Sequence, residues 1–184
     1  MAFIAYFLAA NPHVQDKLRK TIREAQKSNP KASMFGVAQD VYYLDCVIYE
    51  SLRLCPPIFQ MNRSCQEDYG IKGIHIPAGM EVIIPTYAIH HDSKAWPNPE
   101  KFDPDRFRQE NEGDRHSYQF LPFGAGPRNC IAMRFALMEL KMALAQILMK
   151  YKFVQSPETQ FPLALHTGVM LSPRNGNFLR VENA

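Results

Sequence analysis

The chain has 184 residues, of which 46% are hydrophobic, so it is long enough for one domain with an apolar core. Its formal net charge of +3 is mild and implies neither nucleic-acid binding nor a broad basic face for membranes. The cysteines, Cys46, Cys55, Cys65 and Cys130, form no C-x-x-C pair and no zinc spacing, which indicates a reducing compartment rather than a disulfide framework.

The N-terminal residues 1–10 are apolar, but this stretch is too short to span a bilayer. It also lacks the cationic start and the cleavage site of a secretory signal, so we expect no anchor and no signal in this chain. Asn11 as a helix cap and Pro12 at the first helical position then predict a helix start. Apolar residues repeat at helical spacing after it, at Val14, Leu18 and Ile22.

A polar linker is predicted from Ser28 to Ala38, and a second helix from about Gln39 to Leu54, closed off by Pro56. Glu50 and Arg53 are three residues apart, so they share one face of this helix. They form either a surface ion pair, which contributes less than roughly 1 kcal/mol, or a buried pair in a largely apolar segment, where an unpaired charge would be costly.

Short strands are predicted between Tyr69 and Pro85, and the last of them, Val82 to Ile84, is expected to be buried. A short helix is predicted to begin at Tyr87. His90 and His91 have no third metal ligand at a useful spacing, so we expect them to be structural histidines.

Residues 123–132 have the sequence F-G-A-G-P-R-N-C-I-A, and two glycines and a proline in four positions predict a tight loop. Cys130 ends this loop where a long apolar helix is predicted, from Ile131 to about Tyr151. The unpaired N–H groups and the dipole of a helix start favour a thiolate there. Such a cysteine can be a nucleophile, a redox thiol or an axial metal ligand. An inert, half-buried cysteine is the alternative.

The long helix carries two basic positions, Arg134 and Lys141, that we expect to be solvated. With Lys17 and Lys20 they suggest a docking face for an acidic partner protein. The tail from Phe153 to Val181 alternates and predicts a hairpin that turns at residues 173–176.

Phe123, Gly126, Arg128 and Cys130 fall on the fixed positions of the pattern F-x-x-G-x-R-x-C-x-G. The stretch therefore resembles the haem-binding signature of the cytochrome P-450 (haem-thiolate monooxygenase) family. Ala132 replaces the usual final glycine, which adds one methyl group where the helix approaches the porphyrin.

Two further motifs support the resemblance. Glu50 and Arg53 match the family's E-x-x-R motif, and Arg106 lies in a Pro-Asp-Arg-Phe segment where the family has the third member of this network. The resemblance implies that Glu50, Arg53 and Arg106 form a buried structural network that holds the cysteine loop and serves folding and haem retention.

The resemblance covers the C-terminal portion of the family's longer chains. It implies one partial domain over residues 1–184, with a mainly α fold and small β-sheets, and haem b with Cys130 as its axial ligand. The implied haem-binding residues are Arg63, Phe123, Arg128, Cys130, Ala132 and Ala136. The implied substrate pocket is lined by Ile58, Phe59, Met61, Val169 and Met170.

The implied activity is oxidation of lipophilic small molecules with dioxygen and electrons from an NADPH-dependent flavoprotein reductase, at the cytosolic face of the endoplasmic reticulum membrane. The pattern most resembles the animal branch that includes drug and steroid hydroxylases and thromboxane synthase. Two alternatives are a haem-thiolate isomerase, which needs no reductase, and a truncated product without catalysis. In the truncated product, exposed apolar faces would favour aggregation.

Overall fold

The computed structural model describes residues 1–111, 113 and 115–184. In that part of the chain, helices dominate and the strands pair as small antiparallel two-stranded sheets, so the predicted mainly α fold class is confirmed. The helices are α1 (Ala2–Ala10), α2 (Pro12–Ser28), α3 (Met34–Asp40), α4 (Tyr42–Leu54), α5 (Thr86–His90) and α6 (Met133–Lys150). The strands are β1 (Met61–Ser64), β2 (Tyr69–Ile71), β3 (Ile74–Ile76), β4 (Glu81–Ile84), β5 (Tyr151–Gln155), β6 (Leu165–Thr167), β7 (Leu171–Pro173) and β8 (Leu179–Asn183).

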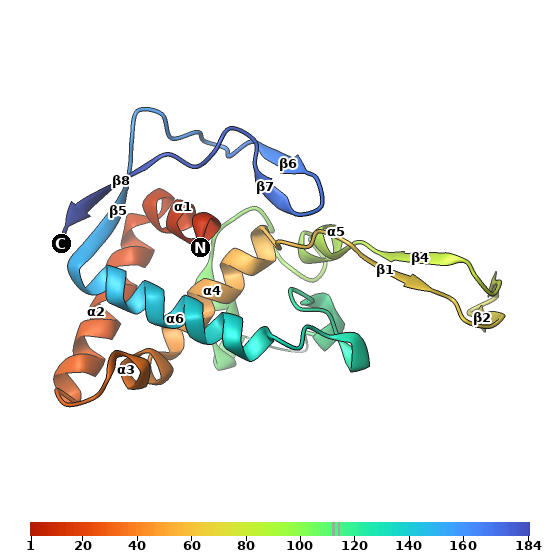
Figure 1. Ribbon diagram of the computed structural model, residues 1–184, viewed down its shortest axis with the longest axis horizontal. Coiled ribbons are helices and arrows are strands. Elements are labelled where there is room, and N and C mark those ends of the chain that lie inside the picture. Colours follow the sequence, from red (N-terminus) through yellow and green to blue (C-terminus); the bar gives the residue numbers. More distant parts are fainter. Residues whose placement is uncertain (112, 114) are drawn as a thin grey trace.

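The helices α1 to α4 pack together with α6, and the hairpin of β1 and β4 extends away from them (Figure 1). The core of this bundle is apolar: Leu18 of α2, Leu44 and Ile48 of α4, and Leu144 and Leu148 of α6 are fully buried. Burial of each such side chain contributes about 2 kcal/mol, so this packing fixes α4 against α6.

Helix α2 follows the predicted amphipathic pattern, and its apolar stripe faces the core. Asn11 occupies the predicted N-cap position of α2, with Pro12 as the first helical residue, but the expected side-chain bond is absent. The Asn11 side chain does not accept a hydrogen bond from α2; instead its Nδ2 donates to the carbonyl of Phe7, 2.9 Å away, at the end of α1. Asn11 therefore stabilises the end of one helix and Pro12 the start of the next.

The helix predicted from Gln39 to Leu54 is confirmed as α4, which ends at Leu54, but its start is wrong, because Gln39 and Asp40 belong to a separate helix, α3. The hydroxyl of Ser33 caps α3 by accepting from the Gly36 N–H at 3.3 Å, so part of the predicted linker is helical. Val41, with φ −89° and ψ 87°, separates α3 from α4, and its buried side chain anchors the break.

The strands agree with the prediction between Tyr69 and Pro85, but β4 is not buried. It pairs with β1 in a two-stranded sheet, with Met61 opposite Ile84, and Ile83 is 53% exposed because such a sheet leaves one face open. The predicted turn of the tail is also wrong. The inner hairpin of β6 and β7 turns between Thr167 and Leu171, and β5 pairs with β8.

Candidate functional site

The cysteine loop is a closed turn between the core and the start of α6. The Cys130 N–H donates to the Phe123 carbonyl at 2.8 Å, which joins the two ends of the loop. Gly124 and Gly126 have φ of +75° and +73°, a left-handed conformation that a residue with a Cβ adopts with strain. A Cβ on Gly124 would also lie 3.2 Å from the Met61 sulfur, so this glycine lets β1 approach the loop.

Helix α6 begins two residues later than predicted, at Met133, and Cys130 is exposed ahead of its first turn. The carbonyl of Cys130 accepts from the Met133 N–H at 3.3 Å, and Ala132 occupies the N-cap position without a side-chain cap. The cysteine thus lies at a helix start whose amides point toward the loop. Ile131, beside it, is 102% exposed.

Glu50, Arg53 and Arg106 meet in the structure, as the motif spacing suggested. Arg53 Nε lies 2.8 Å from Glu50 Oε2 and Arg53 Nη2 lies 2.9 Å from Glu50 Oε1, a two-pronged ion pair with both side chains fully buried. Arg106 Nε lies 3.4 Å from Glu50 Oε1. Burial raises the pKa of the Glu50 carboxyl, while the ion pair with Arg53 acts in the opposite direction.

This network also holds the main chain of neighbouring segments. Arg53 donates to the carbonyls of His90 in α5 and Pro99 at 2.8 and 2.7 Å, and Glu50 accepts from the Asp103 N–H at 2.9 Å. The buried pair on α4 therefore fixes α5 and the irregular segment after it, which includes the short helical turn Pro104–Phe107.

The residues predicted to line the substrate pocket come from two segments that the structure joins. The Leu171 N–H donates to the Pro57 carbonyl at 2.8 Å, which places the β6–β7 turn beside the segment that leads into β1. That segment reaches the cysteine loop where Met61 contacts Gly124. Val169 and Met170 in the turn are exposed, Ile58 is exposed, and Phe59 and Met61 are half-buried.

The predicted haem-binding residues lie at and around the loop with different exposure. Arg128 is exposed and makes no ion pair with any described residue, and Ala132 is exposed, whereas Phe123 and Ala136 are half-buried. Arg63 is half-buried in β1, and its Nη1 donates to the carbonyl of Asn62 at 2.8 Å. Neither Arg63 nor Arg128 forms an ion pair with another described residue, so both guanidinium charges are open to an anionic ligand.

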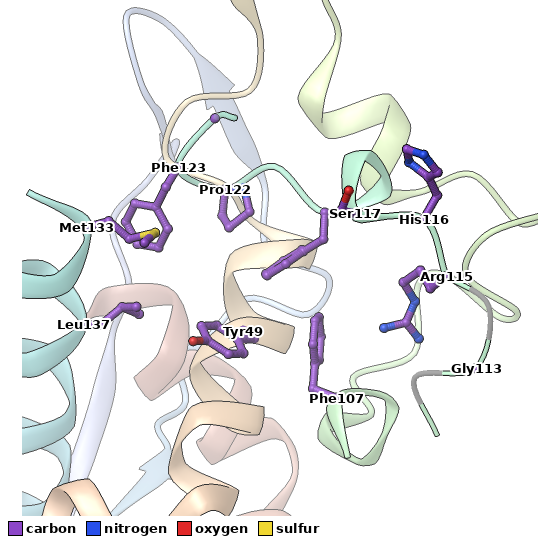
Figure 2. Close-up of a pocket in the computed structure, with 12 residues that line it drawn as sticks. Tyr49, Phe107, Gly113, Arg115, His116, Ser117, Pro122, Phe123, Met133 and Leu137 are labelled. Atoms are coloured by element: carbon purple, nitrogen blue, oxygen red, sulfur yellow. The ribbon is translucent and has the colours of Figure 1, made fainter. Parts of the chain in front are cut away.

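A cavity of about 500 Å³, which the sequence analysis did not predict, lies beneath the loop. Figure 2 shows Phe123, Met133 and Leu137 along one side of this cavity and Arg115 and His116 along the other, with Tyr49 and Phe107 between them. Cys130 and Arg128 do not line it. The cavity thus contacts the base of the loop and not the end that carries the cysteine.

A family model described as Cytochrome P450 matches residues 1–180. The chain belongs to the cytochrome P450 family. This P450 chain is 44% identical over 181 residues to cytochrome P450 3A2 of Rattus norvegicus, 43% over 183 residues to cytochrome P450 3A5 of Homo sapiens, and 41% over 181 residues to thromboxane-A synthase of Sus scrofa. These matches cover 98% to 100% of this chain and 34% to 36% of each relative, so the chain spans about a third of their length. The resemblance to this branch is confirmed.

The donor atoms of the P450 chain fit a porphyrin-bound metal better than a bare ion. Among the described residues, no group of three or more His, Cys, Asp or Glu side chains is arranged to hold a metal ion. A single exposed thiol with a nearby guanidinium suits a metal that brings its other ligands with it, and the anionic groups of such a ligand would meet Arg128. Within the same described part of the chain, none of the helices has the length and apolar character needed to span a bilayer.

Proposed function

We propose that this chain is the C-terminal haem-binding portion, over residues 1–184, of a P450 monooxygenase that oxidises lipophilic small molecules. The observation that supports this most strongly is the position of Cys130. It is exposed at the end of a loop that a hydrogen bond to Phe123 closes, in a chain of the P450 family. Haem b is the cofactor that this thiol would hold as axial ligand.

Each residue around the loop has a task in binding that ring. Arg128 and Arg63 would pair with its two carboxylates through charge-assisted hydrogen bonds. Phe123 belongs to the same closed loop as Cys130, and its half-buried ring would help to keep water from the sulfur once haem is bound. Ala132 and Ala136 are one turn apart and small, so they leave room for a flat ligand against α6. Glu50, Arg53 and Arg106 stabilise the fold and retain the haem without taking part in the chemistry.

When bound, haem supplies the activation of dioxygen, and a thiolate ligand favours O–O cleavage. The chain contributes orientation and a dry, apolar surface. Ile58, Phe59, Met61, Val169 and Met170 supply that surface, because Leu171 and Met61 tie their segments to each other and to the loop. Their side chains are apolar, so the substrate class they favour is lipophilic.

The partner we propose is an NADPH-dependent flavoprotein reductase at the cytosolic face of the endoplasmic reticulum membrane, as the family resemblance implies. The docking face predicted for this donor needs correction. Lys141 is buried and its Nζ lies 2.8 Å from Asp45 Oδ2, and Lys17 Nζ lies 2.8 Å from Asp105 Oδ1, so neither is a free cation. Lys20 and Arg134 remain exposed.

The match to a protein named thromboxane-A synthase favours a second candidate, a haem-thiolate isomerase that needs no reductase. The two candidates differ in what turnover requires. A monooxygenase consumes NADPH and dioxygen together with an apolar substrate, and it needs the reductase to pass on the electrons. An isomerase converts a lipid peroxide without them. A chain that binds haem and shows neither reaction is the truncated, non-catalytic product.

The decisive test is the absorption spectrum of the purified chain with added haem, after reduction and binding of carbon monoxide. We expect a Soret band at the red-shifted position typical of thiolate ligation, and its loss in Cys130→Ser. Cys65→Ser is the matched control, because Cys65 is also partly accessible but lies far along the chain, next to β1. A band that persists in Cys130→Ser, or no such band in the unmodified chain, contradicts the proposal.

A further inference from the structure

His90, at the end of α5, joins the buried ion pair to the cysteine loop. Its ring is fully buried, with Nδ1 3.2 Å from the Arg53 carbonyl and Nε2 2.8 Å from the Leu121 nitrogen. Its own carbonyl accepts from Arg53 Nη1 at 2.8 Å. His90 and Arg53 thus bond each other's main chains, and the ring reaches the segment that precedes the loop.

The partners fix the state of the imidazole. A backbone N–H can only donate, so Nε2 must be the unprotonated acceptor for Leu121. A carbonyl can only accept, so Nδ1 carries the proton that points at Arg53. Both ring nitrogens are therefore used, in one tautomer, and a charged imidazolium would lose the bond to Leu121. Phe120 packs against the ring with centroids 5.3 Å apart, which holds its orientation.

Hydrogen bonds continue from Leu121 into the loop. The Leu121 carbonyl accepts from the Gly124 N–H at 3.2 Å, and the Phe123 carbonyl, between these two residues, accepts from the Cys130 N–H at 2.8 Å. The side chain of Leu121 is buried, so the main chain at this point is fixed by packing and by His90 together.

We propose that His90 is a positioning residue for the Cys130 loop. By accepting from the Leu121 N–H, its Nε2 sets where the loop starts, and so where the cysteine sulfur lies relative to α4. This role rests on the proposed haem-thiolate function, because the loop matters for ligation only if Cys130 is the ligand. From the sequence, His90 is expected only to be a structural histidine, and neither the family resemblance nor the motifs connect it to the cysteine loop.

A pair of amide substitutions separates the two ring nitrogens. The amide of Asn lies about as far along the side chain as Nδ1, so His90→Asn keeps a donor for Arg53 and removes the acceptor for Leu121. The amide oxygen of Gln reaches about as far as Nε2, so His90→Gln keeps the acceptor. Gln15→Leu is the matched control: Gln15 is buried and bonds the main chain of Phe153 at 2.8 and 2.9 Å, between α2 and β5.

The first readout needs no haem: amide hydrogen exchange at Leu121 in the folded chain. We expect exchange at Leu121 to become roughly ten times faster in His90→Asn, the factor typical of leaving one buried N–H without an acceptor. In His90→Gln and Gln15→Leu, the exchange rate at Leu121 should stay close to its value in the unmodified chain. Equal exchange in all four proteins overturns the proposal, whether or not the chain binds haem.

The second readout is the share of thiolate-type Soret absorbance per bound haem in the reduced carbon monoxide complex. We expect this share to fall in His90→Asn and to remain in His90→Gln and in Gln15→Leu at equal helix content. If the unmodified chain shows no thiolate band, the proposed function fails, and exchange at Leu121 alone decides whether His90 fixes the loop. If the band is present and His90→Asn retains it in full, the positioning role is wrong.

Discussion

Arg53 is the residue whose donors serve most segments around the site. Its Nε and Nη2 bind Glu50, its Nη1 binds the His90 carbonyl, and Nη2 also reaches the Pro99 carbonyl. Only a planar guanidinium presents donors in these directions at once. The Arg53 Cζ atom also lies over the Trp96 ring, 5.2 Å from its centroid. A lysine keeps the charge but serves at most part of this set.

We therefore expect Arg53→Lys to lower the free energy of unfolding by about 3 to 5 kcal/mol, the range for breaking a buried ion pair from one side. Urea unfolding followed by far-UV circular dichroism measures this loss. The matched control is Lys20→Ala, which breaks the exposed pair with Glu24, 3.9 Å away, and should change stability by less than about 0.5 kcal/mol. A small loss in Arg53→Lys would show that charge alone, without the forked geometry, holds the segment.

His90 also makes stability depend on pH. Burial lowers the pKa of its ring from 6.5 to about 4, and the nearby charges of Arg53 and His91 act in the same direction. Below pH 6.5 the unfolded chain takes up a proton that the folded chain refuses until about pH 4. Its contribution is thus fully present above pH 6.5 and is lost as the pH falls to about 4, a loss of about 3 kcal/mol.

Urea unfolding of the unmodified chain and of His90→Gln between pH 7 and pH 4 measures this contribution, since glutamine does not titrate. The carboxylates and His91 titrate in both proteins and change the stability of both alike. The difference between the two stability curves therefore isolates His90. We expect the stability of the unmodified chain to fall more steeply with acid. Parallel curves would mean that the buried ring takes up a proton in the folded chain as readily as in the unfolded chain, which contradicts the prediction.

At the scale of elements, α4 and α6 are joined by a polar contact inside an apolar interface. Lys141 Nζ lies 2.8 Å from Asp45 Oδ2, and the two side chains are only 7% and 20% exposed. Asp45→Asn leaves the ammonium group buried without a counter-charge, and we expect a loss of about 3 kcal/mol in urea unfolding. The double variant Asp45→Asn with Lys141→Met should recover most of that loss, because no buried charge remains. If the double variant is as unstable as the single one, packing rather than charge governs this interface.

The same pair shows what sequence could and could not predict about the elements. Lys141 was predicted to be solvated because lysines usually are. Yet it lies three and seven residues before Leu144 and Leu148, on the face of α6 that enters the core. The helical spacing of Lys141 from these two leucines therefore predicts its burial. The break between α3 and α4 at Val41 is harder to predict from the sequence, because Val41 is neither glycine nor proline. Its burial in the core explains the turn.

The candidate site likewise has one part that the sequence predicts and another part that depends on tertiary packing. The family resemblance predicted Glu50, Arg53 and Arg106 together, and they meet because one helix turn and one short helical turn carry them. The bond from His90 to Leu121 spans 31 residues and depends on how α5 packs against the loop, so no local pattern in the sequence predicts it. The cavity beneath the loop depends likewise on tertiary packing.

For the whole molecule, the apolar surface near the loop predicts self-association. Ile131 is 102% exposed and Phe135 62%, and the two are four residues apart at the start of α6. Folded monomers seldom expose several large apolar side chains together. The chain spans about a third of its relatives' length.

We expect the haem-free chain to sediment as oligomers at micromolar concentration, and the double variant Ile131→Lys with Phe135→Lys to raise the monomer fraction in sedimentation velocity. Added charge by itself also opposes association. The control therefore carries the same two charges at exposed polar positions of another face, Gln39→Lys with Asn29→Lys. Only the first variant should dissociate the oligomers. If both do so equally, net charge rather than the apolar surface at α6 governs association, and if neither does, the contact lies elsewhere on the molecule.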